Sequence, residues 1–161
     1  MRPLMDGNKV DTGWPTAGLY IHVPFCESKC TYCAFYSVAD PTYRKRYVDA
    51  VLREAEQRRA NPAEPWHKAV FDTLYLGGGT PSVLEIADCV RLFDGLSRLF
   101  HWSASPEITF ELNPEHRGLI ADLRRYTPVN RLSMGIQSFR DERLRFMRRR
   151  HSGREAREAS E

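Results

Sequence analysis

The sequence predicts an α/β fold with a parallel sheet, because short β-branched or aromatic runs alternate four times with stretches of helical periodicity. The four expected strands are residues 18–23, 71–76, 107–112 and 131–136. Strands that alternate with helices are joined by right-handed crossovers, so their carboxyl ends meet at one edge of the sheet. We therefore expect the loops after the strands to form the functional face.

The expected helices carry their own start signals. Asp40-Pro41 resembles an N-cap followed by proline at the first helical position, ahead of apolar residues at helical spacing from Tyr43 to Ala55. A second helix should extend from Leu84 to Phe100, with Ser82-x-x-Glu85 as a capping box near its start. The third and fourth helices are expected after Asn113-Pro114 and from about Asp141, and residues 154–161 also resemble a helix.

Four strand–helix units are too few for a closed barrel, which ordinarily needs eight strands and about 250 residues. The last strand would keep an unpaired edge. We therefore expect residues 1–16 to be a flexible tail and residues 17–161 to be the first part of a longer domain, with further strands and a C-terminal domain outside this sequence. A compact four-unit domain with a free edge is the alternative.

Composition narrows the class of protein. With 42% hydrophobic and 28% charged residues, the 161-residue chain has the composition of a globular domain with a core. Its net charge of +3 is too small to argue for a nucleic-acid partner. The arginine-rich run 140–150 predicts a solvated helix face, or one or two arginines that point at an anionic ligand. No apolar stretch approaches the roughly 18 residues of a membrane span, and no signal peptide is visible, so we expect a cytoplasmic protein.

Three cysteines, Cys26, Cys30 and Cys33, follow the first expected strand. This spacing brings three thiolates within reach of one metal centre, although a cluster normally takes four cysteine ligands. A missing ligand leaves an open position, which is typical of a chemical site. A zinc site completed by His22 or a distant group is the alternative, whereas a disulfide fits a reducing compartment poorly. The fourth cysteine, Cys89, lies in an apolar-periodic segment and is predicted to be a core residue.

Other unusual residues fall at the ends of the later strands. Gly78 and Gly79 belong to a triple-glycine turn that ends in Thr80, and such a turn lets a ligand contact bare backbone. The Glu111 carboxylate suits the hydroxyls of a ribose. Each feature alone could be a tight turn or a rim carboxylate that caps a helix. Gln137 offers a donor and an acceptor, or is an ordinary turn residue, and Arg149 could pair with a carboxylate or belong to the solvated face.

Together these residues carry a family resemblance. The run Tyr20-x-His22-x-Pro24-Phe25-Cys26-x3-Cys30-x2-Cys33 resembles the signature of radical S-adenosylmethionine (SAM) proteins. More narrowly, it is similar to the oxygen-independent coproporphyrinogen III oxidase group, which includes the HemW-type haem chaperones. Motifs of that group follow in order up to Ser152: Gly77-Gly78-Gly79-Thr80-Pro81, Glu111-x-Asn113-Pro114, Asn130-Arg131-x-Ser133-x-Gly135-x-Gln137-Ser138-Phe139 and Arg149-x-His151-Ser152.

The resemblance implies a partial (β/α) barrel of the radical SAM type, here about four units long, that binds a [4Fe–4S] cluster and SAM. The cluster would give one electron to the sulfonium and a 5′-deoxyadenosyl radical would form. By motif position, Cys26, Cys30 and Cys33 would hold the cluster, Gly78, Gly79 and Thr80 the methionine end of SAM, and Glu111 its ribose, while Tyr20 would lie near the sulfonium and Gln137 and Arg149 would complete the pocket.

One difference from the cysteine motif distinguishes between members of this group. Members that decarboxylate coproporphyrinogen carry a further cysteine two residues after the third cluster cysteine, where this chain has Phe35. The resemblance therefore favours haem binding and transfer, with a haem-accepting protein and an electron-donor protein as partners. Porphyrinogen oxidation and a structural zinc module are the alternatives. No haem ligand is named: His22 is expected to support the cluster loop, and His67, His101 and His116 are expected to be surface or core histidines.

Overall fold

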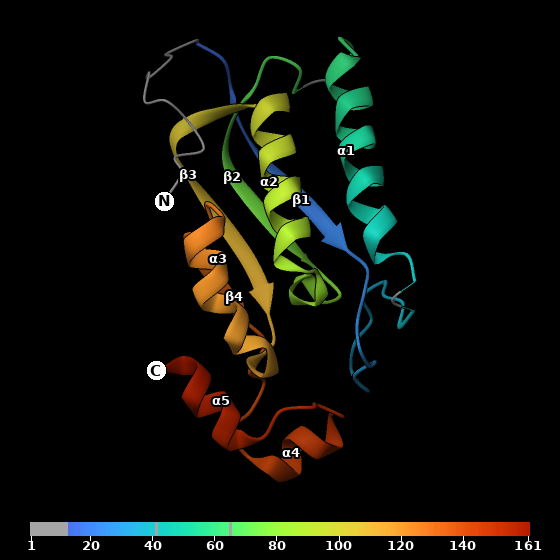
Figure 1. Ribbon diagram of the computed structural model, residues 1–161, viewed down its shortest axis with the longest axis vertical. Helices are drawn as coiled ribbons and strands as arrows, with labels where there is room; N and C mark the ends of the chain where they lie inside the picture. Colours follow the sequence, from blue (N-terminus) through green and yellow to red (C-terminus); the bar gives the residue numbers. More distant parts are fainter. Residues whose placement is uncertain (1–12, 41, 65) are drawn as a thin grey trace.

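The computed structural model describes residues 13–40, 42–64 and 66–161. Its centre is a four-stranded, fully parallel sheet in the order β1-β2-β3-β4 (Figure 1). The strands are β1 (Thr16–Val23), β2 (Val70–Gly78), β3 (His101–Leu112) and β4 (Arg131–Met134). The sheet is open, so the predicted α/β class, the parallel pairing of four strands and the absence of closure are confirmed.

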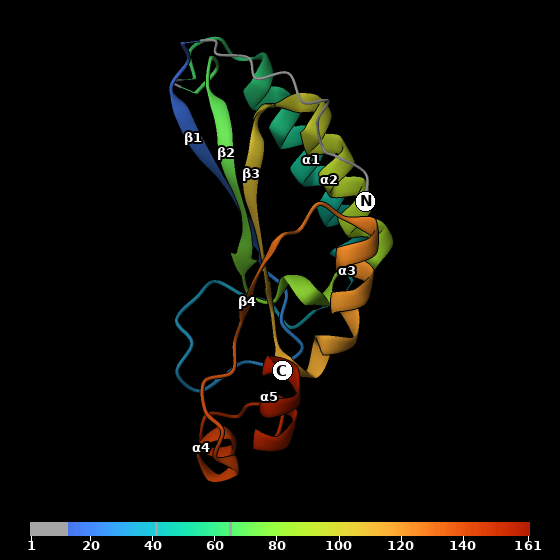
Figure 2. The same ribbon diagram turned by 90° about the vertical axis from the view of Figure 1, so that its left-hand side faces the viewer.

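Helices α1 (Arg44–Ala60), α2 (Ile86–Leu99) and α3 (Ile120–Tyr126) cover one face of the sheet (Figure 2). Two 3-10 helices, η1 (Pro81–Val83) and η2 (Pro114–Leu119), lead into α2 and α3. Helices α4 (Asp141–Phe146) and α5 (Gly153–Ser160) lie beyond the carboxyl ends of the strands (Figure 1). In the described ranges, no helix has the length and apolar character needed to cross a membrane.

The core lies between the sheet and α1 and α2. Alternate strand residues such as Val23, Leu76 and Phe110 are fully buried, and Leu92 and Phe93 of α2 pack against them. Because side chains alternate across a strand, the residues between them point to the other face. Cys89 of α2 is also fully buried in this core, as predicted, and burial raises the pKa of its thiol to about 12.

The opposite face of the sheet carries polar and aromatic side chains. In register across the strands lie Tyr20, Tyr75, Thr109 and Arg131. The Arg131 guanidinium donates to the Thr109 hydroxyl at 3.0 Å. No helix among the described elements covers this face (Figure 2).

Two predicted helix caps are wrong. Helix α1 begins at Arg44, and the Asp40 carboxylate instead accepts the Thr42 backbone N–H at 2.8 Å; Pro41 lies outside the described residues. Helix α2 begins at Ile86 without a side-chain cap, so Ser82-x-x-Glu85 is not its capping box. The tail prediction for residues 1–16 falls mostly outside the described residues, although Thr16 already belongs to β1.

The arginine-rich run does not form one solvated helix. Helix α4 ends at Phe146, and Arg148 adopts a left-handed backbone with φ of 54°. The turn at Arg148 brings Arg149 back toward the carboxyl ends of the strands, where its guanidinium is largely enclosed by polar partners.

Candidate functional site

The three cysteines occupy a loop between β1 and α1 whose ends are tied together. The Cys26 N–H donates to the Val38 carbonyl at 2.9 Å, and the Val38 N–H donates to the Pro24 carbonyl at 2.7 Å. All three cysteines are free thiols; Cys26 is buried and the other two are half-buried. The loop is therefore anchored at both ends while its cysteines remain available as ligands.

His22 supports this loop from the polar face of the sheet. Its Nε2 donates to the Tyr36 carbonyl at 2.9 Å, because a carbonyl oxygen can only accept. Its Nδ1 is then an acceptor, and the Tyr20 hydroxyl donates to it at 3.1 Å. The expectation that His22 supports the cysteine loop agrees with these bonds.

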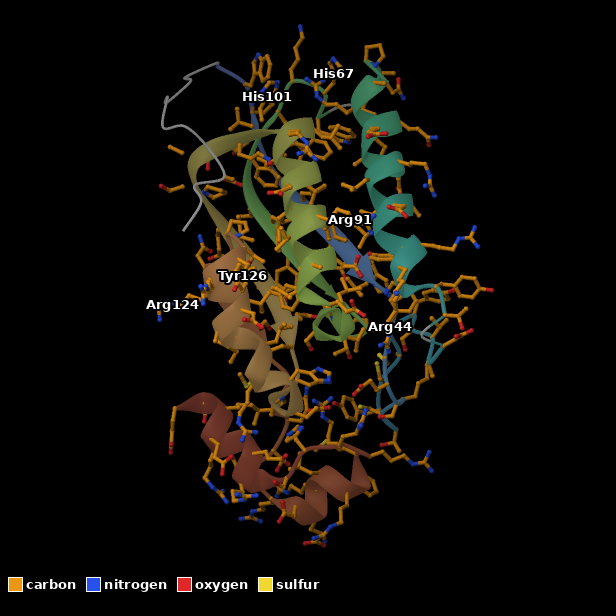
Figure 3. The ribbon with its side chains drawn as sticks, in the orientation of Figure 1. Arg44, His67, Arg91, His101, Arg124 and Tyr126 are labelled. Atoms are coloured by element: carbon orange, nitrogen blue, oxygen red, sulfur yellow. The ribbon has the colours of Figure 1, made fainter. Side chains whose placement is uncertain are left out.

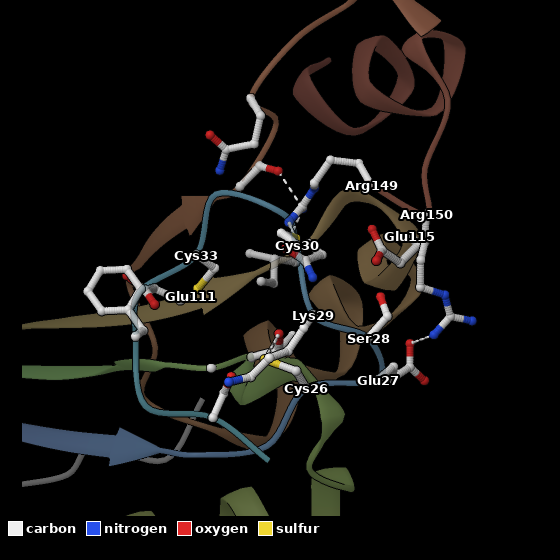
Figure 4. A pocket seen from close by; sticks show the side chains of 18 of the residues that line it. Cys26, Glu27, Ser28, Lys29, Cys30, Cys33, Glu111, Glu115, Arg149 and Arg150 are labelled. Atoms are coloured by element: carbon white, nitrogen blue, oxygen red, sulfur yellow. Dashed lines mark hydrogen bonds and ion pairs between the residues drawn. The ribbon is translucent and has the colours of Figure 1, made fainter. Parts of the chain in front are cut away.

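Two of the cysteine sulfurs accept hydrogen bonds from residues far away in the sequence. The Thr80 hydroxyl donates to the Cys26 sulfur and an Arg149 N–H donates to the Cys30 sulfur, each at 3.6 Å. Within the described ranges, no group of three His, Cys, Asp or Glu side chains is placed to hold a single metal ion. Figure 4 shows the three cysteines spread around a cleft, with Arg149 reaching toward Cys30.

The glycine turn passes so close to the cysteine loop that side chains are excluded. A Cβ on Gly79 would lie 2.6 Å from the Phe25 carbonyl oxygen and 3.0 Å from the Cys26 sulfur. Gly78 has a φ of 110°, and a Cβ there would meet the His22 ring at 2.7 Å. Close approach to other parts of the protein therefore requires these glycines, and both also line the cleft described below.

Glu111 at the end of β3 is held by two donors. Its carboxylate accepts the Tyr75 hydroxyl at 2.6 Å and the Gly78 N–H at 3.2 Å. Burial raises the pKa of Tyr75, and the hydrogen bond to Glu111 adds to this rise, so the phenol remains a donor. The carboxylate keeps further lone pairs for a ligand.

Arg149 is fixed before any ligand arrives. Its Nη2 donates to the Asn113 side-chain oxygen at 2.6 Å and to the Gly135 carbonyl at 2.7 Å. Its Nε is buried without a hydrogen-bond partner among the described residues. Gln137, two residues after Gly135, has a φ of 63°, and strained backbone of this kind is concentrated at functional sites.

These features meet in one cleft of about 270 Å³ at the carboxyl ends of the strands. Nine of the ten residues predicted for the site line it: Cys26, Cys30, Cys33, Gly78, Gly79, Thr80, Glu111, Gln137 and Arg149. The tenth, Tyr20, lies on the polar face of the sheet and does not line this cleft. Burial, followed by the charge of Glu111, raises the pKa of Tyr20.

Two residues of the site, Tyr75 and His116, were not predicted from the sequence. Tyr75 orients Glu111. Tyr75 pairs with Thr109, two residues before Glu111, so both side chains lie on the same face of the sheet, and this alternation was the available signal. His116 was expected to be a surface or core histidine, but it lines the cleft and bonds to Ser82 at 2.7 Å. By contrast, His67 and His101 lie together at the opposite end of the sheet, as Figure 3 shows.

An open parallel α/β sheet whose cysteine loop and glycine turn share one cleft at the carboxyl ends of its strands has the architecture of a cofactor-binding class of protein. The family model that matches residues 20–161 is that of the Radical SAM superfamily, and the chain belongs to this superfamily. In general, its members use a [4Fe–4S] cluster and SAM.

Relatives and a solved structure point to the same group. The chain is 35% identical to the haem chaperone HemW of Escherichia coli, over 91% of this chain and 38% of the relative. It is 34% identical to the oxygen-independent coproporphyrinogen III oxidase of Salmonella typhimurium, over 81% of this chain and 28% of the relative. The structure of coproporphyrinogen III oxidase (HemN) from Escherichia coli, a radical SAM enzyme, matches with a TM-score of 0.70 and 30% identity, over 90% of this chain and 35% of HemN. The chain thus spans between 28% and 38% of the length of these relatives.

Proposed function

We propose that this chain is the cluster- and SAM-binding part of a HemW-like haem chaperone, which binds haem and transfers it to acceptor proteins. The observation that carries the proposal is the single cleft in which the three free thiols meet the glycine turn and Glu111. Residues 17–161 would then be the first part of a radical SAM domain. The free cysteines suit a reducing compartment, and we propose the cytoplasm.

The donor set of the cleft fits a [4Fe–4S] cluster. Such a cluster binds each cysteine through a different iron, so its ligands surround it rather than converge on one point. Cys26, Cys30 and Cys33 would be these ligands. Hydrogen bonds from Thr80 and Arg149 to two of the sulfurs would stabilise their thiolate forms.

The remaining residues of the cleft suit SAM. Gly78, Gly79 and Thr80 would present backbone and hydroxyl groups to its methionine end, and Glu111 would accept bonds from its ribose. Gln137 and Arg149 would complete the pocket. When bound, the cluster and SAM together supply one-electron cleavage of the sulfonium. Tyr20 stays a prediction for the sulfonium side of the pocket.

Phe35 supports haem handling over porphyrinogen oxidation. It stands where decarboxylating members of the group have a further cysteine, and its side chain is 68% exposed at the margin of the cleft. A phenyl ring can neither bind iron nor transfer a proton, but it offers an apolar surface to a flat macrocycle. The resemblance to the Salmonella typhimurium oxidase keeps coproporphyrinogen III oxidation to protoporphyrinogen IX as the second candidate.

The first experiment measures iron, acid-labile sulfide and zinc in protein that is purified and reconstituted without air. We expect a cluster in the wild type and its loss in Cys33→Ser, whereas Cys89→Ala, a change at the buried cysteine, should retain it. Zinc without iron or sulfide would instead indicate a structural zinc module.

The second experiment separates the two haem-related candidates. Anaerobic titration with haem should give a stoichiometric complex with the chaperone, and its absence would remove that assignment. Carbon dioxide released from coproporphyrinogen III would favour the oxidase. The electron donor and the haem acceptor would be separate proteins.

A further inference from the structure

The segment from Arg140 to Arg150 forms a positively charged surface, which we call the α4 surface. It contains six arginines against Asp141 and Glu142, so its formal charge is +4 although the whole chain carries only +3. Of its two acids, Asp141 accepts the Gly153 N–H at 2.7 Å. The segment lies beyond the carboxyl ends of the strands (Figure 1).

The arginines of the α4 surface divide into two groups. Arg149 turns inward to Asn113 and the cysteine loop, and Arg150 pairs with Glu27 of that loop. The side chains of Arg140, Arg143, Arg145 and Arg148 are exposed and form no ion pair or hydrogen bond with other described residues. Arg148 also lines the cleft, so Arg140, Arg143 and Arg145 are the three cations left on the outside for a partner.

An exposed aromatic residue belongs to the same segment as these arginines. Phe146 is 83% exposed, the highest value among the large apolar side chains in the described part of the chain. Aromatic residues and arginines are the types enriched in the buried centres of protein–protein interfaces. An exposed apolar ring that shares a short segment with exposed arginines has the composition of a docking surface for an acidic protein.

The same surface is bonded directly to the cysteine loop. The Thr31 hydroxyl donates to the Phe146 carbonyl at 3.2 Å, and the Thr31 N–H donates to the Met147 carbonyl at 3.4 Å. Thr31 follows Cys30 in the chain, so only one residue separates a cluster-binding position from the exposed ring. A partner seated on Phe146 would therefore lie beside the cluster loop.

We propose that the α4 surface docks an acidic one-electron carrier protein that reduces the cluster, a proposal that rests on the function proposed above. One electron leaves the carrier's anionic flavin hydroquinone, which becomes the neutral semiquinone, and the oxidised cluster becomes singly reduced. No bond breaks and no proton moves. Complementary charge would steer the carrier to this end of the fold.

A nucleic acid fits the α4 surface less well than a protein. Single-stranded nucleic acids are bound by grooves that combine positive charge with several aromatic rings for successive bases. Here Phe146 is the one aromatic residue in the segment 140–150. An anionic lipid surface could also bind these arginines, so the experiment must distinguish lipid binding from binding of a carrier protein.

The test uses cluster-loaded protein and flavodoxin hydroquinone, an acidic flavoprotein, mixed without air in a stopped-flow spectrometer. The variant is Arg143→Glu with Arg145→Glu, which brings the α4 surface to a formal charge of zero. The matched control is Arg124→Glu with Arg125→Glu on α3, where Arg124 points into solvent away from the cleft (Figure 3). Reduction by dithionite, a small reagent that needs no docking surface, is followed in all three proteins.

We expect the α4 variant to be reduced by flavodoxin at least tenfold more slowly at low salt, and to lose most of its salt dependence. Phe146→Ser should weaken flavodoxin binding roughly fivefold or more. The α3 control should behave as the wild type, and dithionite should reduce all proteins equally.

Several results would overturn the inference. Equal flavodoxin rates for both charge-reversal variants, or a wild-type cluster that only dithionite reduces, would show that this surface does not dock such a carrier while leaving the proposed function intact. The same follows if the α4 variant loses binding to phosphatidylserine vesicles or single-stranded DNA but keeps its flavodoxin rate. A wild type without any cluster would remove the proposed function and this inference together.

Discussion

Replacement of Glu111 by glutamine tests the proposed nucleotide site. One carboxylate oxygen accepts the Tyr75 hydroxyl at 2.6 Å and the other accepts the Gly78 N–H at 3.2 Å. A glutamine amide can satisfy Tyr75 through its oxygen, but its NH2 group then faces the Gly78 N–H. Two donors oppose each other, and the glycine turn loses its acceptor.

The expected magnitudes follow from these two bonds. A half-buried donor left without an acceptor costs about 1–3 kcal/mol, so the free energy of unfolding should fall by an amount in this range. A hydrogen bond from a ribose hydroxyl to a charged acceptor contributes about 1.5–3 kcal/mol. Its loss would raise the dissociation constant for SAM roughly 10- to 150-fold, since about 1.4 kcal/mol is a factor of ten.

Urea unfolding measures the first quantity, and anaerobic calorimetric titration of the cluster-loaded protein with SAM measures the second. Tyr75→Phe is the matched control, because it removes the phenol donor but keeps the carboxylate and its bond to Gly78. We expect it to lower the free energy of unfolding by about 0.5–1.5 kcal/mol and to leave SAM binding nearly unchanged. If Glu111→Gln binds SAM as tightly as the wild type, Glu111 does not hold the ribose.

Three further predictions concern the loop, the core and the C-terminal helix. Gly79→Ala should cost about 1–3 kcal/mol of stability and lower cluster occupancy, because its Cβ would meet the Phe25 carbonyl oxygen at 2.6 Å; normal iron content would contradict this. Iodoacetamide at pH 8 should modify the half-buried Cys30 and Cys33 of cluster-free protein long before Cys89, whose thiol has its pKa raised to about 12 by burial, and mass spectrometry of peptides reports the order. Two hydrogen bonds from Ser152, one from its backbone N–H and one from its hydroxyl, lower the pKa of Glu155. The stability that this pair gives α5 is therefore fully present above the ordinary glutamate pKa of 4.5, and it is lost as the pH falls through the lowered value. Glu155→Gln, which removes the charge but keeps the shape of the side chain, should therefore lower the free energy of unfolding at pH 7 but much less at pH 2, and an equal loss at both pH values would refute this assignment.

The sequence predicts the sheet well because burial in a parallel sheet imposes a regular pattern. The apolar positions that alternate through β1 and β2 mark the helix-covered face, and the ends of the strands mark the cleft. The start of β3 was missed, since Ser103, Ser105 and Pro106 are poor strand formers. Its first residues, His101 and Trp102, nevertheless pair with β2 ahead of a register shift.

Other features depend on contacts that no local pattern encodes. Ser82 has the spacing of a helix cap, but its hydroxyl bonds to His116, which is 34 residues away. The arginine run has a helical composition, yet the left-handed backbone at Arg148 ends the helix and sends Arg149 into the cleft. Tertiary partners decide these positions, and they are visible only when the strands are assembled.

The span of the Arg149–Cys30 contact has a consequence for the order of folding. These residues are 119 positions apart, and Arg149 reaches the sulfur only when β3 and β4 have paired and delivered Asn113 and Gly135. Contacts between distant parts of a chain form late, because the entropy of closing the intervening loop must first be overcome. During synthesis, the cysteine loop therefore emerges from the ribosome long before its arginine partner, and the Cys30 sulfur gains this hydrogen-bond donor only after β4 has joined the sheet.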